Sequence, residues 1–259
     1  MALAAATVAA VAAVGIGSGR EAAPTVADAR ARPQVLLISG MPLATPPDAS
    51  APLAGFVDGP LLARVRAGSE LREVDALPPP RDLDAPVWWI AHPLALPPGA
   101  IAAIDSHVRR GGAALIFADG LYTGETPHPL GDPRNPPVTS LLTPLLAHWG
   151  LSLDAPEGLT DTAQRAEVRG RTLSFRSPGT LRAASAGDAT CRVEAGGLTA
   201  ECAVGSGKAV VVADADLLTP HGEECVAQNG DWLLAELRKL SLGANEHSRN
   251  GTETKAKHP

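Results

Sequence analysis

Apolar runs alternate with amphipathic segments through the middle of the chain. The segment 34–40 is continuously apolar and ends in Ser-Gly, as a buried parallel strand does. Further strands are predicted at 71–77, 87–92 and 113–120. Helices are predicted between them at 60–67 and 100–110, the second with an apolar stripe at every third or fourth residue and a Gly-Gly stop. This rhythm predicts an α/β fold, with a mostly parallel sheet and helices on both faces.

The second half of the chain has a different pattern. Residues 121–138 are rich in Pro, Gly, Asp and His and form a loop longer than ordinary connections, which is typical of a functional or mobile segment. A short helix at 144–149 follows, and 151–204 predict short antiparallel strands, with a hairpin extension around 160–204. Residues 208–216 predict another buried strand. A final helix is expected from Asn229 to Gly243.

The pattern divides the chain into one domain with two flanking segments. Residues 33–243 form the predicted domain, and 244–259 a polar tail that we expect to be disordered. Residues 1–19 are small, apolar and uncharged before Arg20, which predicts a signal peptide or membrane anchor, followed by a linker at 20–32. An Ala-rich buried helix is the alternative. Export or anchoring would place the domain in the periplasm or on the outer side of the inner membrane.

Two of the three cysteines lie on a predicted hairpin. A turn at Gly196-Gly197 puts Cys191 opposite Cys202, with Val193 opposite Ala200 on the same face. The pairing predicts α-carbons ~5.5 Å apart, within the range for a disulfide. Two buried thiols are the alternative. No cysteine pair has the spacing of a metal site, and no metal or cofactor is predicted.

Composition excludes one class of partner. The 259 residues include 22 basic and 28 acidic side chains, for a net charge of -6, and only 3% are aromatic. A nucleic-acid binder needs a basic face, and a single-strand binder needs aromatic stacking platforms. We therefore expect no nucleic-acid partner.

The residues best suited to binding or catalysis lie at the ends of the predicted strands. Ligands of open parallel sheets bind outside the carboxyl ends of the strands. Aspartate also caps the turn that follows a strand, so a purely structural role is the alternative. The predicted ligand-binding residues at these ends are Ser39, Gly40, Met41, His92, Asp119, Gly120, Asp214 and Asp216.

Three other motifs give weaker evidence of a functional site. The strand-to-helix turn where a nucleophile elbow would hold Ser or Cys has Asp119 instead. The segment 205–208, Gly-Ser-Gly-Lys, leads into a strand rather than a helix, so it is a turn and not a phosphate loop. His128, His148 and His221 are scattered, and a packed or solvated role suits each.

The order and spacing of several segments resemble a known family. These segments are 35–43, 88–93, 96–105, 110–119, 145–151, 210–216 and 229–234. Together, over 33–242, they are similar to the GldG-like auxiliary domain of uncharacterised ABC-type transport systems, named after gliding-motility components. The resemblance implies a fold like class I glutamine amidotransferases or flavodoxin. It also implies an extracytoplasmic, membrane-tethered domain working with an ABC permease and ATPase, and it implies no catalytic residues.

Three functions follow as expectations. The first is a non-enzymatic accessory protein that binds a ligand or partner of an ABC-type transport system. The alternative is a hydrolase using Asp119, with His92 as base. The third is a binding module for a cation or a sugar at the strand-end carboxylates.

Overall fold

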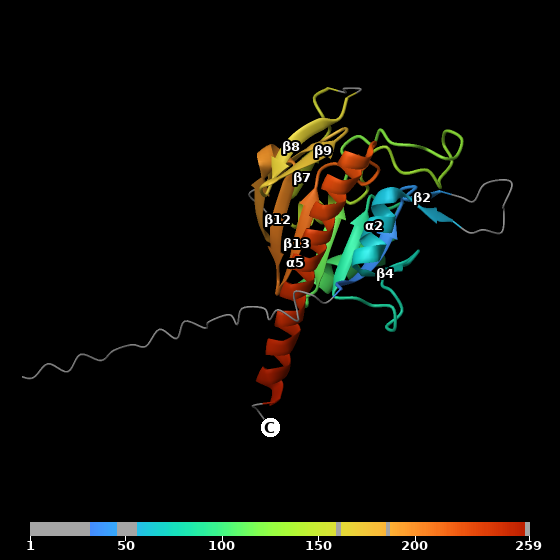
Figure 1. The fold of residues 1–259 in the computed structure, drawn as a ribbon. Helices are drawn as coiled ribbons and strands as arrows, with labels where there is room; N and C mark the ends of the chain where they lie inside the picture. Colours follow the sequence, from blue (N-terminus) through green and yellow to red (C-terminus); the bar gives the residue numbers. More distant parts are fainter. Residues whose placement is uncertain (1–31, 46–55, 159–161, 185–186, 257–259) are drawn as a thin grey trace, which may run out of the picture.

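Seven strands form one mixed sheet at the centre of the computed structural model, which describes residues 32–45, 56–158, 162–184 and 187–256 (Figure 1). The strand order is β11-β12-β13-β6-β5-β1-β4. The last five run parallel to one another, whereas β12 and β11 run antiparallel at one edge. The strands are β1 (Gln34–Ser39), β4 (Glu70–Glu73), β5 (Val87–Ala91), β6 (Ala113–Phe117), β11 (Thr190–Glu194), β12 (Thr199–Val204) and β13 (Gly207–Val212).

The predicted flavodoxin-like or amidotransferase-like class is wrong, because the seven-stranded sheet is mixed and ends in an antiparallel edge. Tight turns at 195–198 and 205–206 reverse the chain without a crossover helix, so 190–212 joins the sheet as an antiparallel meander. Three further two-stranded antiparallel ladders lie outside the main sheet. They pair β2 (Ala44–Thr45) with β3 (Val57–Asp58), β7 (Leu151–Asp154) with β10 (Thr180–Ala183), and β8 (Gln164–Val168) with β9 (Arg171–Phe175).

Helices cover both faces of the sheet because alternate strand residues point to opposite sides. Val35 and Leu37 of β1 belong to the core beneath α2 (Pro60–Gly68) and α5 (Glu223–Ala256). Leu36 and Ile38 belong to the core beneath α3 (Pro98–Arg109) and α4 (Thr143–His148). The central strands β1, β5, β6 and β13 thus present a buried surface on each face, and their polar residues lie at or next to their ends.

Helix α5 is longer than the sequence predicts. It begins at Glu223, where two acidic residues favour the positive end of the helix dipole, and it continues past Gly243 to Ala256. The predicted end at Gly243 is wrong, because one glycine in a helix costs only about 1 kcal/mol and the next residue, Ala244, is buried against the core. In Figure 1 the C-terminal half of α5 projects beyond the sheet.

The hairpin β11–β12 has the predicted register. Cys191 pairs with Cys202, and Val193 pairs with Ala200. The structure joins the two cysteines in a disulfide, with α-carbons 4.0 Å apart rather than the expected ~5.5 Å. That spacing is nearer the ~4.5 Å of a non-hydrogen-bonded cross-strand pair. Cys225 is a free thiol.

The predicted leader (1–19) and all of the predicted linker (20–32) except Arg32 lie outside the described residues. Arg32 donates from its guanidinium to the carbonyl oxygens of Arg66 and Ser69. None of the helices in the described part of the chain combines the length and the hydropathy that crossing a bilayer requires.

Candidate functional site

Three aspartates meet at the carboxyl ends of two neighbouring strands. Asp119 follows β6, and Asp214 and Asp216 follow β13, which pairs with β6 in parallel. One carboxylate oxygen of each lies within 4.8 Å of the other two. The three side chains are 0%, 0% and 2% exposed. The strand-end aspartates therefore form one buried cluster, called here the aspartate cluster.

Backbone amides hold Asp119 and Asp214. Asp119 accepts hydrogen bonds from the amides of Leu121 (3.0 Å) and Ala215 (3.1 Å), one on each carboxylate oxygen. Asp214 accepts from the amides of Arg176 (2.7 Å) and Leu217 (3.1 Å) in the same way. Two of these four bonds close local turns, and the other two join segments far apart in sequence. These aspartates thus perform the capping role that the sequence leaves open, but across the fold as well as locally.

Asp216 is held on one oxygen only. Its Oδ2 accepts from the Thr123 amide (3.0 Å), the Thr123 hydroxyl (2.7 Å) and the Ser177 hydroxyl (2.8 Å). Its Oδ1 is buried and has no hydrogen-bond partner among the described residues. A β-carbon at Gly124 would lie 2.5 Å from this oxygen, so the main chain of the loop closes directly over it.

The aspartate cluster carries more negative charge than its surroundings offset. Burial, then the charge of Asp216, raises the pKa of Asp119 to about 7. Burial, then the charges of Asp119 and Asp216, raises the pKa of Asp214 well above its usual value. Two ionised carboxylates at this spacing repel by about 3 kcal/mol at an effective dielectric of about 20. Within the described residues, no Lys or Arg forms an ion pair with any of the three, although the Arg176 amide contacts Asp214.

His92 is a structural histidine in this arrangement. Its Nε2 donates to the carbonyl oxygen of Pro137 at 2.7 Å, and its Nδ1 accepts from the Asp119 amide at 3.3 Å. Burial lowers the pKa of His92, which keeps the ring neutral. Tyr122 stacks on the ring, with centroids 5.4 Å apart. Because both ring nitrogens are engaged, His92 fastens the 118–142 loop to the sheet.

The other predicted ligand-binding residues form no hydrogen bond with the cluster carboxylates in the described structure; they are Ser39, Gly40, Met41 and Gly120. The Ser39 hydroxyl accepts from the Met41 amide at 3.0 Å, and Met41 is part of the core. Gly40 approaches the carbonyl oxygen of His92 so closely that a β-carbon would lie 2.5 Å away. Gly120 is pressed in the same way against the carbonyl oxygen of Asp154, at 2.6 Å.

Thr123 and Ser177 are cluster residues that the sequence analysis missed. Both contact Asp216 Oδ2, one from the long loop and one from the segment between β9 and β10. Neither residue lies at the end of a predicted strand, so the sequence pattern could not predict that they contact Asp216.

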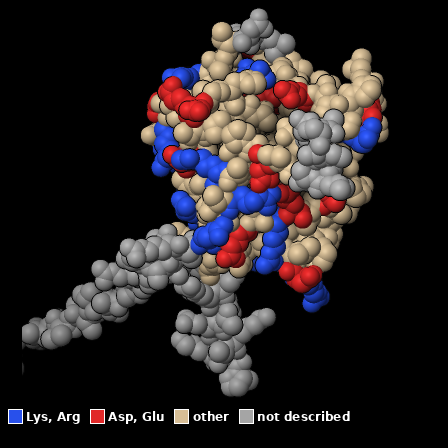
Figure 2. Space-filling view, turned by 45° about the vertical axis from the view of Figure 1, so that its right-hand side comes forward, with Lys and Arg blue, Asp and Glu red and all other residues tan. Residues whose placement is uncertain are grey.

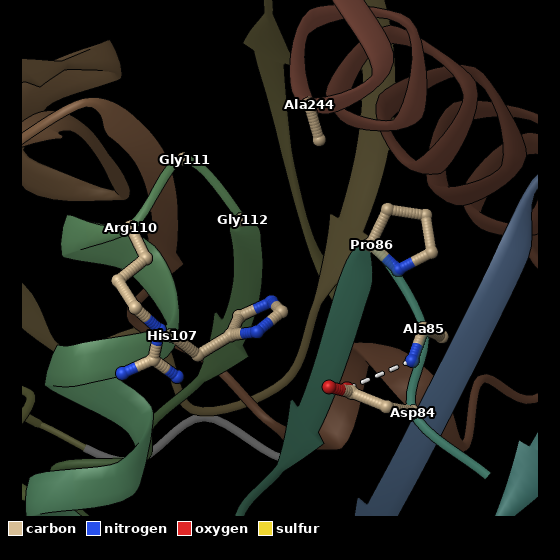
Figure 3. Close-up of a pocket in the computed structure, with 8 residues that line it drawn as sticks. All are labelled: Asp84, Ala85, Pro86, His107, Arg110, Gly111, Gly112 and Ala244. Atoms are coloured by element: carbon tan, nitrogen blue, oxygen red, sulfur yellow. Dashed lines mark hydrogen bonds between the residues drawn. The ribbon is translucent and has the colours of Figure 1, made fainter. Parts of the chain in front are cut away.

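A hollow lies before the amino ends of β5 and β6, at the end of the sheet opposite to the aspartate cluster, and Figure 3 shows the residues that line it. This open pocket has a volume of about 360 Å³, and His107 forms part of its wall. The His107 ring stacks on Trp88 with centroids 4.1 Å apart, and its Nε2 is buried without a hydrogen-bond partner in the described structure. No motif of the sequence predicts this pocket. The residues that line it are Asp84, Ala85, Pro86, His107, Arg110, Gly111, Gly112 and Ala244.

Comparison with known proteins finds structures that share part of this chain's fold. No family model and no curated protein matches the chain. A cytoplasmic protein from Salmonella typhimurium LT2 is similar over 80% of this chain and 98% of its own, with a TM-score of 0.52 and 13% identity. A β-galactosidase from the haloarchaeon Halorubrum lacusprofundi matches 82% of this chain with a TM-score of 0.49 and 15% identity.

The chain spans only 30% of the length of that β-galactosidase. An exo-β-1,4-mannosidase from an Opitutaceae bacterium matches 82% of this chain with a TM-score of 0.42 and 14% identity, and the chain spans 36% of its length. At these identities the Salmonella match concerns fold alone. The function has to be argued from the residues of this chain.

Proposed function

We propose that this chain is a non-enzymatic accessory domain that binds a partner, of the kind that works beside an ABC permease and ATPase. The observation that carries the non-enzymatic part is the closure of the strand ends. The side chains with catalytic potential there are at most 2% exposed and hold backbone groups. A catalytic acid, base or nucleophile has to reach a substrate atom. The transport context rests on the family resemblance.

The hydrolase alternative fits the same geometry poorly. Asp119 would act as nucleophile and His92 as base. Both oxygens of Asp119 accept amide protons, and His92 contacts the Asp119 amide rather than its carboxylate. A hydrolytic role would therefore require the loop to leave the sheet. We expect the wild-type chain to show no hydrolytic activity, so replacing Asp119 with Asn should change none.

The surface around the closed strand ends offers a binding face. Large apolar side chains are exposed on the 118–142 loop, which follows β6, and on the β2–β3 ladder, whose first strand follows β1. Such side chains in number mark surfaces that contact a partner. They are Phe56 (74% exposed), Val57 (58%), Leu130 (105%), Val138 (66%) and Leu141 (44%).

The described residues on the face shown in Figure 2 form no patch of one charge sign that would suggest a different binding surface. Acidic and basic side chains are interspersed there among uncharged residues. Among the described residues, several acidic and basic side chains pair with one another, as Arg64 does with Asp231 and Arg66 does with Asp58. We therefore propose that apolar contacts from the loop, rather than a field of one sign, carry recognition of the partner subunits.

Affinity capture from membranes tests this proposal. The full chain with a C-terminal affinity tag should recover permease or ATPase subunits of an ABC system from detergent-solubilised membranes. Leu130→Asp combined with Val138→Asp should reduce that recovery at least about fivefold, because a desolvated carboxylate opposes an apolar contact. Ala102→Asp, at an exposed position of α3, is the matched control and should behave as wild type. Recovery of soluble proteins alone would contradict the proposal.

A further inference from the structure

We propose that the aspartate cluster is a structural site for one divalent cation of the calcium type, held by Asp119, Asp214 and Asp216. This inference does not depend on the partner proposed above. It rests on the spacing of the carboxylates and, independently, on a buried oxygen that lacks a partner.

The spacing suits a cation that prefers oxygen ligands. Three carboxylate oxygens lie within 4.8 Å of one another, so there is a point that lies within about 2.8 Å of all three. Calcium–oxygen bonds are about 2.3–2.6 Å long, whereas magnesium requires about 2.0–2.1 Å and near-octahedral geometry. The cluster offers no sulfur, and the one nearby imidazole has both nitrogens engaged. A hard ion is therefore favoured over zinc.

The backbone hydrogen bonds leave room for such an ion. Asp119 and Asp214 each receive one amide proton per oxygen. A carboxylate oxygen has two lone pairs, so each oxygen keeps one for a metal. The amides also hold the carboxylates in place, as the outer-shell partners of a metal site do.

Asp216 supplies the independent observation. Its Oδ2 has three donors, yet its Oδ1 is buried, in a residue 2% exposed, and has no hydrogen-bond partner among the described residues. Buried polar atoms in folded proteins nearly always have a partner, and a missing ion is one explanation when they do not. A cation between the three side chains would satisfy this oxygen.

The bound ion would fasten two segments of the chain together directly and a third through Asp216. Asp119 begins the 118–142 loop, to which Thr123 also belongs, Asp214 and Asp216 follow β13, and Asp216 also accepts a hydrogen bond from Ser177 between β9 and β10. The ion would thus stabilise the edge of the sheet that carries the exposed apolar residues. Because its ligands are enclosed, exchange with solvent requires the loop to open, and release to a chelator should be slow.

Metal content and thermal stability test the site. The full chain, without a metal-binding tag, is incubated with EDTA at raised temperature and desalted, and calcium, magnesium or manganese is then added. We expect one calcium per chain by native mass spectrometry. We also expect a rise in Tm of at least about 5 °C at a calcium concentration about 100 times Kd, since only the native state binds.

Two variants separate the site from general charge effects. Asp216→Asn should lose the calcium-dependent rise in Tm, while Asp231→Asn, which removes an exposed carboxylate from α5, should keep it. If Asp216→Asn does not fold, the wild-type stoichiometry still decides. A chain that binds none of the three metals in a one-to-one ratio, or a rise in Tm that survives in Asp216→Asn, would overturn the proposal.

Discussion

Arg169 joins three glutamates from separate elements, and its replacement by methionine measures what that ion-pair network contributes to stability. Its guanidinium bonds Glu194 (2.9 Å), Glu201 (2.9 Å) and Glu236 (2.6 Å), on β11, β12 and α5. The Arg169 side chain is only 18% exposed, and Glu236 is 8% exposed. Removing it leaves Glu236 without an ion pair in the described structure, and it leaves Glu194 and Glu201 with only their exposed partners, Arg192 and Lys239.

The expected cost lies between two limits. Breaking a fully buried pair costs about 3–5 kcal/mol, and an exposed pair is worth about 1 kcal/mol or less. Glu194 and Glu201 are 23% and 24% exposed, so solvent screens part of the effect and we expect Arg169→Met to cost about 2–3 kcal/mol. For a domain of this size that corresponds to a fall in Tm of about 5–10 °C.

Urea and thermal unfolding of two variants test the estimate. Arg192 pairs with the same Glu194 at 2.6 Å but is 76% exposed, so Arg192→Met is the matched control and should change stability by less than about 0.5 kcal/mol. Arg169 also has a left-handed φ of 51° in the β8–β9 turn. Arg169→Asn removes the ion pairs but suits that conformation, and it should still destabilise. Equal effects of Arg169→Met and Arg192→Met would refute the reasoning.

Two further predictions concern the pocket and the hairpin. Burial lowers the pKa of His107, so the folded state resists its protonation, and stability due to this group is lost as pH falls below the ordinary histidine pKa of about 6.5. Asp84 and Arg110 face the ring with opposite charges, and His107→Phe should therefore show a smaller fall in Tm between about pH 7.5 and pH 5.5 than wild type. The disulfide spans a sequence separation of 11, so changing Cys191 and Cys202 together to alanine should cost about 3 kcal/mol in urea unfolding. Tm that is insensitive to reducing agent in wild type would argue against that bond.

The meeting of the aspartates could be predicted from sequence because it follows from strand geometry. Parallel strands end at a common edge, so Asp119 and Asp214 were expected together once both preceding segments were identified as buried strands. Likewise the Gly196-Gly197 turn fixes the register of Cys191 against Cys202 by local chemistry.

What escaped prediction depends on contacts between distant segments. Thr123 and Ser177 reach Asp216 only after the loop has folded onto the sheet. The two ring nitrogens of His92 contact Pro137, 45 residues away, and Asp119, 27 residues away. The hairpin itself is predicted, but its place in the central sheet is not, because that place is decided by the pairing of β12 with β13 and of β13 with β6.

Hydrogen exchange tests most directly whether the strand ends are closed. The amides of Leu121 and Arg176 donate to the buried Asp119 and Asp214, while the amide of Arg134 donates to the carboxylate of Asp132 at the surface. Residue-resolved exchange should show Leu121 and Arg176 protected about 1,000-fold or more relative to Arg134, because they open only with larger unfolding. Exchange of Leu121 and Arg176 as fast as that of Arg134 would mean that the strand ends are open to solvent, and the account of a closed, non-catalytic edge would then be wrong.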